Sequence, residues 1–238
     1  AEGGIEAGKA GIDLIPGIEI TADSEREQHI LGYFFDIDEV ALSRMRKTLL
    51  DMRRERVSRV LAYLNGLGVS IDFEEIAARR EKAYIGRPHI AEAVVRAGRA
   101  RDIREVFERY FTGADFRRAD RPRPSARESI EMIRAAGGAA SLAHPHTLRL
   151  SNEDLERAIE KLQDLGLTGL ECHYGTYERS VRDAYCRIAE KRGLAITGGS
   201  DFHGPVIRPG VEIGTGYKGL LDFNDLGVAE RLRAVTFS

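Results

Sequence analysis

Residues 16–33 read PGIEITADSEREQHILGY, and this stretch decides how the rest of the chain is interpreted. It holds parts of two short, β-rich apolar runs, 14–20 and 30–34, separated by a charged loop, which predicts two neighbouring strands. Glu19 interrupts the first run, and His29 comes directly before the second. Because a carboxylate is costly to bury without a partner, we expect a buried Glu19 that binds a metal rather than forming a structural salt bridge. His29 taken alone fits a metal ligand and a strand-start residue bonded to a loop equally well.

The composition is that of an ordinary soluble globular protein. The 238 residues, 42% hydrophobic and 31% charged, suffice for one large domain or a domain with an insertion. A net charge of −2 argues against a dedicated nucleic-acid binder. We find no apolar run long enough to span a membrane and no secretory signal, so no membrane partner is expected. The two cysteines, Cys172 and Cys186, form no disulfide framework, and a cytoplasmic location is therefore expected.

Residues 37–125 have the pattern of a mostly helical insertion. Apolar residues from Leu42 to Leu64 recur near helical spacing, which predicts a helix or helix pair that ends at Gly66 or Gly68. The other face of this segment carries basic residues, namely Arg44, Arg46, Lys47, Arg53, Arg54, Arg56 and Arg59. We favour a solvated face paired with acidic side chains over a basic wall for an anionic substrate.

Three shorter motifs follow inside this insertion. Residues 72–75, DFEE, predict a capping box at the start of a short helix. Residues 86–89, GRPH, predict a turn that starts another helix, with proline near its first position. Residues 113–124, GADFRRADRPRP, are interpreted as a basic loop rich in arginine and proline.

From Ser125 onward, helices and strands alternate. The sequence Ser125-x-x-Glu128 predicts a capped helix ending at 137–138, and Ser151 predicts the cap of a second helix. The expected strands are 139–143, 169–172 and 194–197, with a further helix over 177–192. Alternation with short loops predicts parallel strands joined by helical crossovers.

Histidine and aspartate side chains gather at the ends of these strands. His144 follows the strand 139–143, and Asp201 and His203 follow the strand 194–197 after two glycines. Since the carboxyl ends of parallel strands face the same side, the pattern indicates a metal site. His146 and His173 are interpreted as supporting residues, and Cys172 as part of a strand core. Nitrogen and oxygen donors suit zinc, manganese and iron about equally.

The ordered motifs PGIE, HILGY, GRPH, AHP and GSDFHG resemble the PHP (polymerase and histidinol phosphatase) family, and most closely its stand-alone metal-dependent phosphoesterases. The resemblance implies an α/β fold, a distorted (β/α)7 TIM-like barrel formed by residues 1–36 and 126–238. The helical insertion subdomain would comprise residues 37–125.

The resemblance also implies roles for individual residues. Glu19 would bridge two metals, His29 and His144 would complete the second metal site, and Asp201 would join Glu19 on the first. His203 would serve a third metal, and Asp201 and His203 together would be catalytic. Arg87 and His89 would face the substrate phosphate, although a turn and a helix start explain those two residues equally well.

The family's His-x-His and Asp-His motifs do not occur before Glu19. Residues 1–17 read as the end of a helix, a turn and a strand without an earlier strand, so we expect an N-terminal piece to be missing. One or two of the family's three divalent ions (Mn, Zn or Fe) are therefore expected, and the chain is expected to be inactive if that segment is truly absent. A two-histidine, one-glutamate set still forms a workable catalytic zinc environment.

The resulting hypothesis is a hydrolase that cleaves phosphate monoesters of nucleotides, such as nucleoside 3′,5′-bisphosphates, or acts on short RNA 5′ ends through metal-bound hydroxide. The partner would be a phosphorylated small molecule, with short RNA as a second candidate and the oligomeric state left open. An alternative is a degenerate, metal-poor PHP scaffold that binds nucleotide or a partner without catalysis. A third hypothesis is a metal-dependent amide hydrolase, which the GRPH motif and the basic insertion make less favoured.

Overall fold

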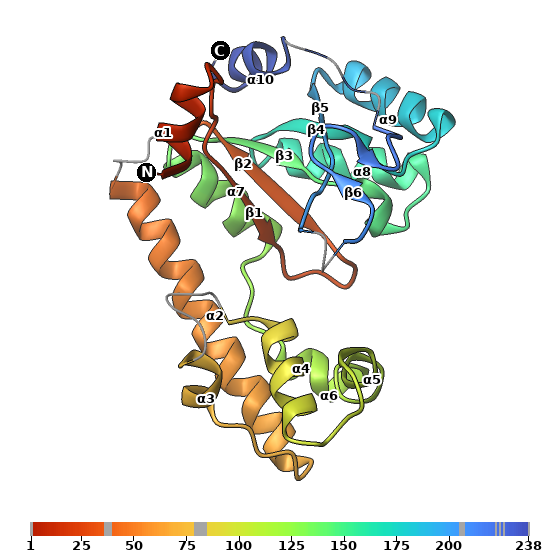
Figure 1. Ribbon diagram of the computed structural model, residues 1–238. Coiled ribbons are helices and arrows are strands. Elements are labelled where there is room, and N and C mark those ends of the chain that lie inside the picture. Colours follow the sequence, from red (N-terminus) through yellow and green to blue (C-terminus); the bar gives the residue numbers. More distant parts are fainter. Residues whose placement is uncertain are drawn as a thin grey trace. The chain divides into compact units, whose positions relative to one another are not determined.

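The computed structural model describes residues 2–35, 40–78, 85–204, 208–221, 223, 225 and 227–237 (Figure 1). Contacts divide the chain into two compact units: unit 1 comprises Ala1–Met45 and Pro124–Ser238, and unit 2 comprises Arg46–Arg123. Helix α2, Val40–Gly66, begins in unit 1 and continues in unit 2. The expected start of the insertion, residue 37, lies outside the described residues.

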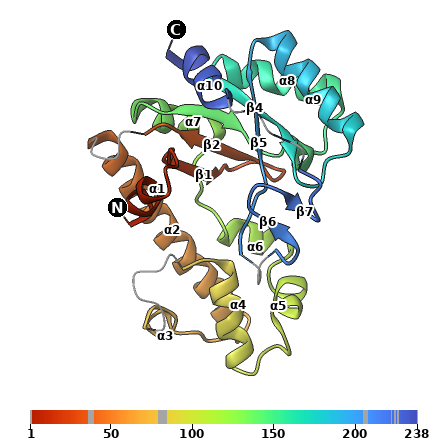
Figure 2. The same cartoon turned by 45° about the horizontal axis from the view of Figure 1, so that its top comes forward.

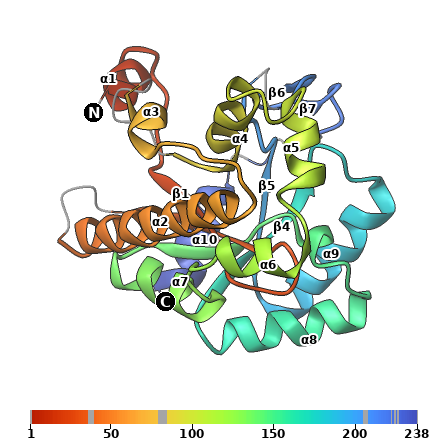
Figure 3. The same cartoon turned by 90° about the horizontal axis from the view of Figure 1, so that it is seen from below.

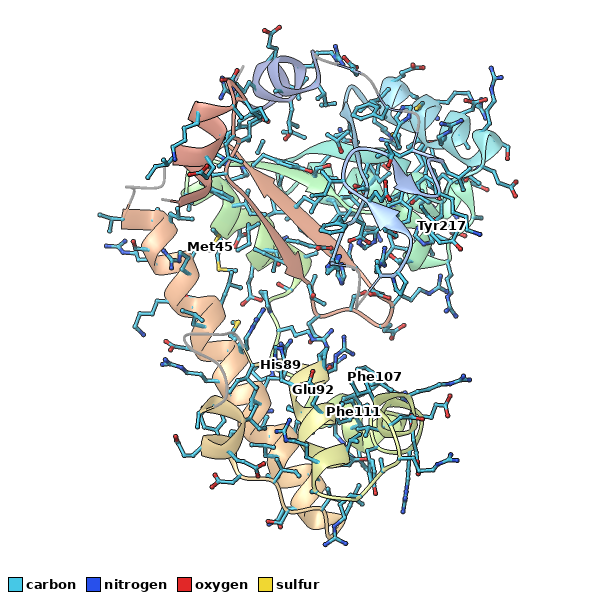
Figure 4. The ribbon with its side chains drawn as sticks, viewed as in Figure 1. Met45, His89, Glu92, Phe107, Phe111 and Tyr217 are labelled. Atoms are coloured by element: carbon cyan, nitrogen blue, oxygen red, sulfur yellow. The ribbon has the colours of Figure 1, made fainter. Side chains whose placement is uncertain are left out.

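Unit 1 contains one sheet of five strands and the helices that cover it. The strands are β1 Gly17–Thr21, β2 His29–Tyr33, β3 Ala139–Leu142, β4 Leu167–Tyr174 and β5 Ala195–Gly199. The helices are α1 Glu2–Lys9, α7 Ala126–Ala135, the 3-10 helix η1 Pro145–Leu148, α8 Asn152–Gln163, α9 Arg179–Arg192 and α10 Val228–Phe237. A small separate sheet pairs β6 Val211–Glu212 with β7 Gly216–Tyr217, which carries the Tyr217 labelled in Figure 4.

The strand order of the large sheet is β1-β2-β3-β4-β5. Strands β1, β2 and β3 are mutually antiparallel, whereas β3, β4 and β5 are parallel. The sequence-based prediction of two neighbouring strands at the start is therefore confirmed, as is the parallel arrangement after residue 125. Helix α7 packs on β2 and β3, α8 and α9 pack on β4, and α10 packs on β3 to β5 (Figure 2). Unit 1 is thus a mixed α/β fold.

The two faces of the first strands have different chemistry because side chains alternate along a strand. Ile20 and its cross-strand partner Ile30 are buried on one face. On that face a Cβ at Gly32 would lie 2.9 Å from Ile133 of α7, so only glycine lets the helix approach this closely. Glu19 alternates with Ile20 and projects from the opposite face, away from the helical layer.

Unit 2 is helical. Its elements, besides most of α2, are α3 Phe73–Ala77, α4 Arg87–Arg96, α5 Ile103–Arg109 and α6 Gly113–Ala119. The predicted long helix is confirmed as one continuous helix ending at Gly66. Helices α4 and α5 run next to each other (Figure 3). Helices α2 to α6 all contribute aliphatic and aromatic side chains to the core of this unit. Phe107 and Phe111, labelled in Figure 4, belong to this packing with ring centroids 5.1 Å apart.

The interpretation of residues 113–124 as a loop is wrong over its first half, because Gly113–Ala119 is helix α6. Two local features stabilise this helix. Phe116 is 4% exposed and stacks on Phe111 at a centroid distance of 4.8 Å, which anchors one face in the core. Asp115 in the first turn pairs with Arg118 three residues later. Two of the arginines in this stretch, Arg117 and Arg118, therefore lie on the solvent side of an amphipathic helix.

The predicted helix starts at Asp72, Ser125 and Ser151 are confirmed, and each of these side chains caps the backbone of its helix. Ser125 accepts a hydrogen bond from the Glu128 N–H, and the Glu128 carboxylate accepts one from the Ser125 N–H, which forms the expected capping box. Ser151 caps α8 by accepting a hydrogen bond from the Asp154 N–H. Asp72 caps α3 through the Glu74 N–H. None of the helices in the part of the chain that the structure describes is both long and apolar enough to cross a membrane.

Candidate metal centre

Three side chains from three strands converge on one point of unit 1. Glu19 lies in β1, His29 opens β2, and His144 follows β3 by two residues. The His29 Nδ1 atom lies 2.6 Å from Glu19 Oε1, and His144 Nε2 lies 3.2 Å from the same oxygen. The two imidazole nitrogens are 3.1 Å apart. These three donor atoms, all within 4.8 Å of one another, are spaced as ligands of a single ion would be.

The sheet register explains why Glu19 and His29 meet. His29 pairs with Thr21, two residues after Glu19, so both side chains project from the same face of the β1–β2 hairpin. The expectation that Glu19 is buried is wrong, because its side chain remains 29% exposed on the face away from the helices. Its place between two isoleucines therefore reflects strand alternation rather than burial in the core.

His144 is held by its backbone as well as its ring. Its φ angle is 22°, an unusual conformation for a residue with a Cβ, and its N–H donates a 2.6 Å hydrogen bond to Glu171 Oε2 in β4. On the ring, Nδ1 lies 3.5 Å from Thr147 Oγ1. The strained turn thus points Nε2 toward Glu19 while the opposite nitrogen faces a hydroxyl group.

A second group of donors shares Glu19. Asp201 and His203 follow β5 and, with Glu19, offer three ligand atoms within 4.8 Å of one another. The His203 Nδ1 atom lies 3.0 Å from Asp201 Oδ1, and Asp201 adopts a positive φ of 52°. Glu19 is therefore the residue that both groups have in common.

Asp201 has two further partners that the sequence reasoning missed. Tyr174, the last residue of β4, donates a 2.9 Å hydrogen bond from its hydroxyl group to Asp201 Oδ2. Arg208 donates to the Tyr174 hydroxyl oxygen at 2.6 Å and lies 2.5 Å from Asp201 Oδ2. The Arg208 side chain is 41% exposed, so its guanidinium group lies at the site and in contact with solvent.

The charged groups of the site shift one another's pKa values. Partial loss of solvent around the carboxylate would by itself raise the pKa of Glu19, but hydrogen bonds from His144 and His29 and their positive charge hold it well below its usual range. Burial likewise opposes protonation of His144, yet the contacts with Glu19 and the charges of Glu171 and Asp201 raise its pKa. Glu19 is therefore an anion at neutral pH, as a metal ligand must be.

Glu171 is a second carboxylate that the sequence analysis overlooked. It is 5% exposed, and burial raises its pKa to about 7 although the His144 N–H and charge oppose this shift. A Cβ at Gly199 would lie 2.9 Å from Glu171 Oε1, so glycine at this position makes room for the carboxyl group. Glu171 lies inside the apolar run 169–172, just as Glu19 lies inside the run 14–20. The same signal in the sequence could therefore have identified Glu171.

Three further residues, interpreted from the sequence as supporting or core residues, belong to neither donor group. The His146 Nδ1 atom contacts the Tyr177 hydroxyl at 2.9 Å, and the ring lies 6.1 Å from that of His144, consistent with a supporting role. His173 stacks on Phe223 with centroids 4.6 Å apart and lines a separate cavity of about 780 Å³. Cys172 is fully buried, which confirms the interpretation as a strand core residue.

Arg87 and His89 belong to unit 2. Arg87 is the first residue of α4, and His89 Nδ1 accepts the Gly86 N–H at 3.0 Å, so this nitrogen closes the start of the helix. Figure 4 labels His89 and, one turn further along α4, Glu92. The prediction that Arg87 and His89 bind substrate stays a prediction.

The donor set fits a divalent metal ion. Two imidazole nitrogens and a carboxylate oxygen form the first group, and two carboxylates with one imidazole form the second. Such mixed nitrogen and oxygen sets are typical of zinc, manganese and iron sites with open positions. The 3.1 Å approach of two histidine nitrogens to each other is natural when both point at a shared cation.

Comparisons with known proteins agree with this chemistry. No protein-family model matches the chain. The 3′,5′-nucleoside bisphosphate phosphatase of Chromobacterium violaceum is 30% identical over 209 residues, covering 86% of this chain and 73% of the relative. The 5′-3′ exoribonuclease of Haemophilus influenzae is 28% identical over 212 residues, covering 86% of this chain and 74% of the relative.

Two solved structures share the fold. A protein from Bifidobacterium adolescentis described as a metal-dependent phosphoesterase matches with a TM-score of 0.75 and 27% identity, over 98% of this chain and 80% of that one. An amidohydrolase from Chromobacterium violaceum, solved with sulfate and no metal, matches with a TM-score of 0.71 and 29% identity, over 86% and 72% of the two chains. With a 30% identical phosphatase relative and two aligned structures, the chain belongs to the PHP family of metal-dependent phosphoesterases.

Proposed function

We propose that this chain hydrolyses phosphoester bonds of nucleotides or RNA, with phosphate monoesters such as those of nucleoside 3′,5′-bisphosphates as the preferred substrates. The convergence of Glu19, His29 and His144 on one point is the observation that carries the proposal. The names of the relatives, a bisphosphate phosphatase and an exoribonuclease, support the substrate class.

Two ions would share Glu19. His29 and His144 would hold one with it, and Asp201 and His203 would hold the other, which differs from the expectation that His203 serves a third ion. Manganese, zinc or iron would suit these donors. A bound divalent ion supplies Lewis acidity toward phosphate and lowers the pKa of water.

The chain's own residues prepare this site. Glu19 stays ionised because two histidines stabilise its charge. His144 presents Nε2 to the site while Nδ1 faces Thr147, which favours the tautomer with the proton on Nδ1. Arg208, anchored on Asp201 and Tyr174, is placed to bind a phosphate oxygen and offset charge on the reacting group.

Three finer proposals follow from the family. The five-stranded sheet would be part of a distorted (β/α)7 barrel, with residues 37–125 as an insertion. Arg87 and His89 would contact the substrate phosphate. Asp201 and His203 would act directly in the reaction, besides binding metal.

Phosphate release from adenosine 3′,5′-bisphosphate and from a 5′-phosphorylated RNA oligonucleotide tests the proposal, using protein supplied with Mn²⁺ or Zn²⁺. His144→Ala and Asp201→Asn should each lose activity by about 100-fold or more, since each removes a proposed ligand. Asp164→Asn, at an exposed position remote in sequence from both donor groups, is the matched control and should keep activity. Wild-type turnover in either site variant would refute the assignment. Protein that binds no stoichiometric metal would instead support the degenerate scaffold.

A further inference from the structure

The two cysteines of the chain meet between β4 and α9. Cys172 lies in β4 and is fully buried, whereas Cys186 lies in α9, which packs on β4, and is partly exposed. A side-chain hydrogen bond joins the two thiol groups. The His173 Nε2 atom lies 3.7 Å from Cys186 Sγ. We call Cys172, Cys186 and His173 the thiol cluster.

An irregularity in β4 builds the thiol cluster. Successive side chains of a regular strand point to opposite faces, so Cys172 and His173 would not share a contact. The register of β4 with β5 shifts between Glu171 and His173, however, and such a bulge changes the direction of the side chains beside it. Both Cys172 and His173 therefore contact Cys186, from consecutive positions of one strand.

The two thiol groups differ in reactivity. The hydrogen bond with Cys186 and burial both raise the pKa of Cys172, so this group remains a thiol at neutral pH. The same hydrogen bond lowers the pKa of Cys186, although burial and the charges of Glu190 and Asp183 oppose this shift. The His173 ring nitrogen is also placed to accept the Cys186 proton. Cys186 is thus the cysteine that is suited to react first, as a thiolate.

Cys186 is also the cysteine that small molecules reach. It is partly exposed, whereas Cys172 has no contact with solvent. Glu190, one turn after Cys186 on α9, lines the cavity of about 780 Å³ together with His173. An oxidant that enters from solvent therefore meets Cys186 before Cys172.

We propose that the thiol cluster is an oxidation site, in which hydrogen peroxide converts Cys172 and Cys186 to a reversible disulfide. The Cys186 thiolate attacks one peroxide oxygen, the O–O bond breaks, and a sulfenic acid forms. The departing oxygen takes up the proton that Cys186 lost and leaves as water. The Cys172 sulfur then attacks the Cys186 sulfur, the S–O bond breaks, and the hydroxyl group leaves with the Cys172 proton as a second water. Two thiols lose two electrons, and one peroxide gains them.

Strand β4 connects the thiol cluster to the metal centre. Glu171, directly before Cys172, accepts the His144 N–H. Tyr174 at the end of the strand donates to Asp201. An S–S bond of about 2.05 Å is much shorter than a hydrogen-bonded contact between two sulfur atoms, so forming it draws β4 and α9 together.

This movement shifts groups that hold two proposed metal ligands. The loss of such a supporting contact typically weakens metal binding by about 10- to 100-fold, so the disulfide should lower zinc affinity about tenfold. The effect on zinc rests on the proposed function, whereas the oxidation itself does not.

Peroxide treatment of the whole, metal-free protein tests the oxidation. Both cysteines should be free before treatment and neither afterwards, when thiols are counted under denaturing conditions. The mass should fall by two hydrogens, electrophoresis without reductant should show single chains, and a phosphine reductant should restore both thiols. Cys172→Ala should stop at a Cys186 sulfenic acid that dimedone captures, and Cys186→Ser should leave Cys172 reduced. Circular dichroism melting verifies that both variants are folded.

Zinc titration against a competing chelator tests the connection, after catalase has destroyed the peroxide. The oxidised wild type should bind zinc about tenfold more weakly than the reduced protein. Peroxide-treated Cys186→Ser is the control for damage elsewhere and should bind zinc like its untreated form.

Three results would overturn the oxidation site: thiols that survive peroxide, a disulfide between two chains, or oxidised Cys186 that forms no bond with Cys172. Equal zinc affinity of the oxidised and reduced proteins would overturn the connection to the metal centre. Absence of zinc binding in both states would overturn that connection together with the proposed metal centre, and the thiol counts would still decide the oxidation.

Discussion

Replacing Glu171 with glutamine should make the metal-free protein more stable at neutral pH but not in acid. Glu171 is almost fully buried, and its pKa is raised from 4.5 to about 7. Below pH 4.5 the carboxyl group is protonated in both the folded and unfolded states and costs nothing. Between pH 4.5 and 7 the unfolded chain releases this proton and the folded chain keeps it, so stability falls as the pH rises.

The size of the effect follows from the shift. A rise in pKa from 4.5 to about 7, at about 1.36 kcal/mol per pKa unit, corresponds to a loss of stability of roughly 3 kcal/mol. This loss reaches its full size above pH 7. Glutamine cannot ionise, and its side-chain oxygen can still accept the His144 N–H that Glu171 accepts now. The variant should therefore equal the wild type near pH 4.5 and exceed it by about 3 kcal/mol at pH 7.5.

Urea unfolding in EDTA, followed by circular dichroism at several pH values from 4.5 to 8, measures this difference. The raised pKa of His144 also makes stability fall with pH, and the charge of Glu171 is one cause of that raised pKa. The comparison therefore reports Glu171 together with its effect on His144. Glu153→Gln, at a side chain that is 82% exposed, is the control and should show no such trend. A difference between Glu171→Gln and the wild type that does not change with pH would refute the reasoning.

Three further outcomes are expected. Glu19→Gln replaces the carboxylate that both donor groups share with an uncharged amide, so zinc affinity measured against a competing chelator should fall about 100-fold or more. An unchanged affinity would contradict the shared-ligand geometry. Arg208→Gln should lower kcat/KM for a phosphate monoester about tenfold while the bound metal content stays constant. A loss of bound metal would show instead that Arg208 only supports Asp201. Ile90→Ala, at a position 1% exposed in the core of unit 2, should cost about 2–5 kcal/mol in urea unfolding, and a loss below 1 kcal/mol would contradict its core placement.

Much of the local structure could be predicted from the sequence. The capping serines at 125 and 151 and the long apolar repeat of α2 placed helices correctly, because caps and periodicity act over a few residues. Residues 113–119 were misassigned because their helix depends on Phe116 packing into a core that the local pattern does not reveal.

The sequence by itself determined which strands carry donor side chains, since His144, Asp201 and His203 follow apolar runs at strand ends. The family resemblance implied which of them meet, but the physical cause of their meeting lies in the tertiary structure. Glu19 and His144 are 125 residues apart in the chain, yet their donor atoms lie 3.2 Å apart. Sheet register and strand order bring them together, and neither can be predicted from a short segment of sequence.

The same holds for the residues that were missed. Arg208 is joined to Tyr174 across 34 residues, and Asp120 collects arginines from three different segments of unit 2. Arg208, Tyr174 and Asp120 look like ordinary surface charges or strand residues in the sequence. A charge acquires its role from the partners and the loss of solvent that folding imposes on it, and those depend on long-range packing.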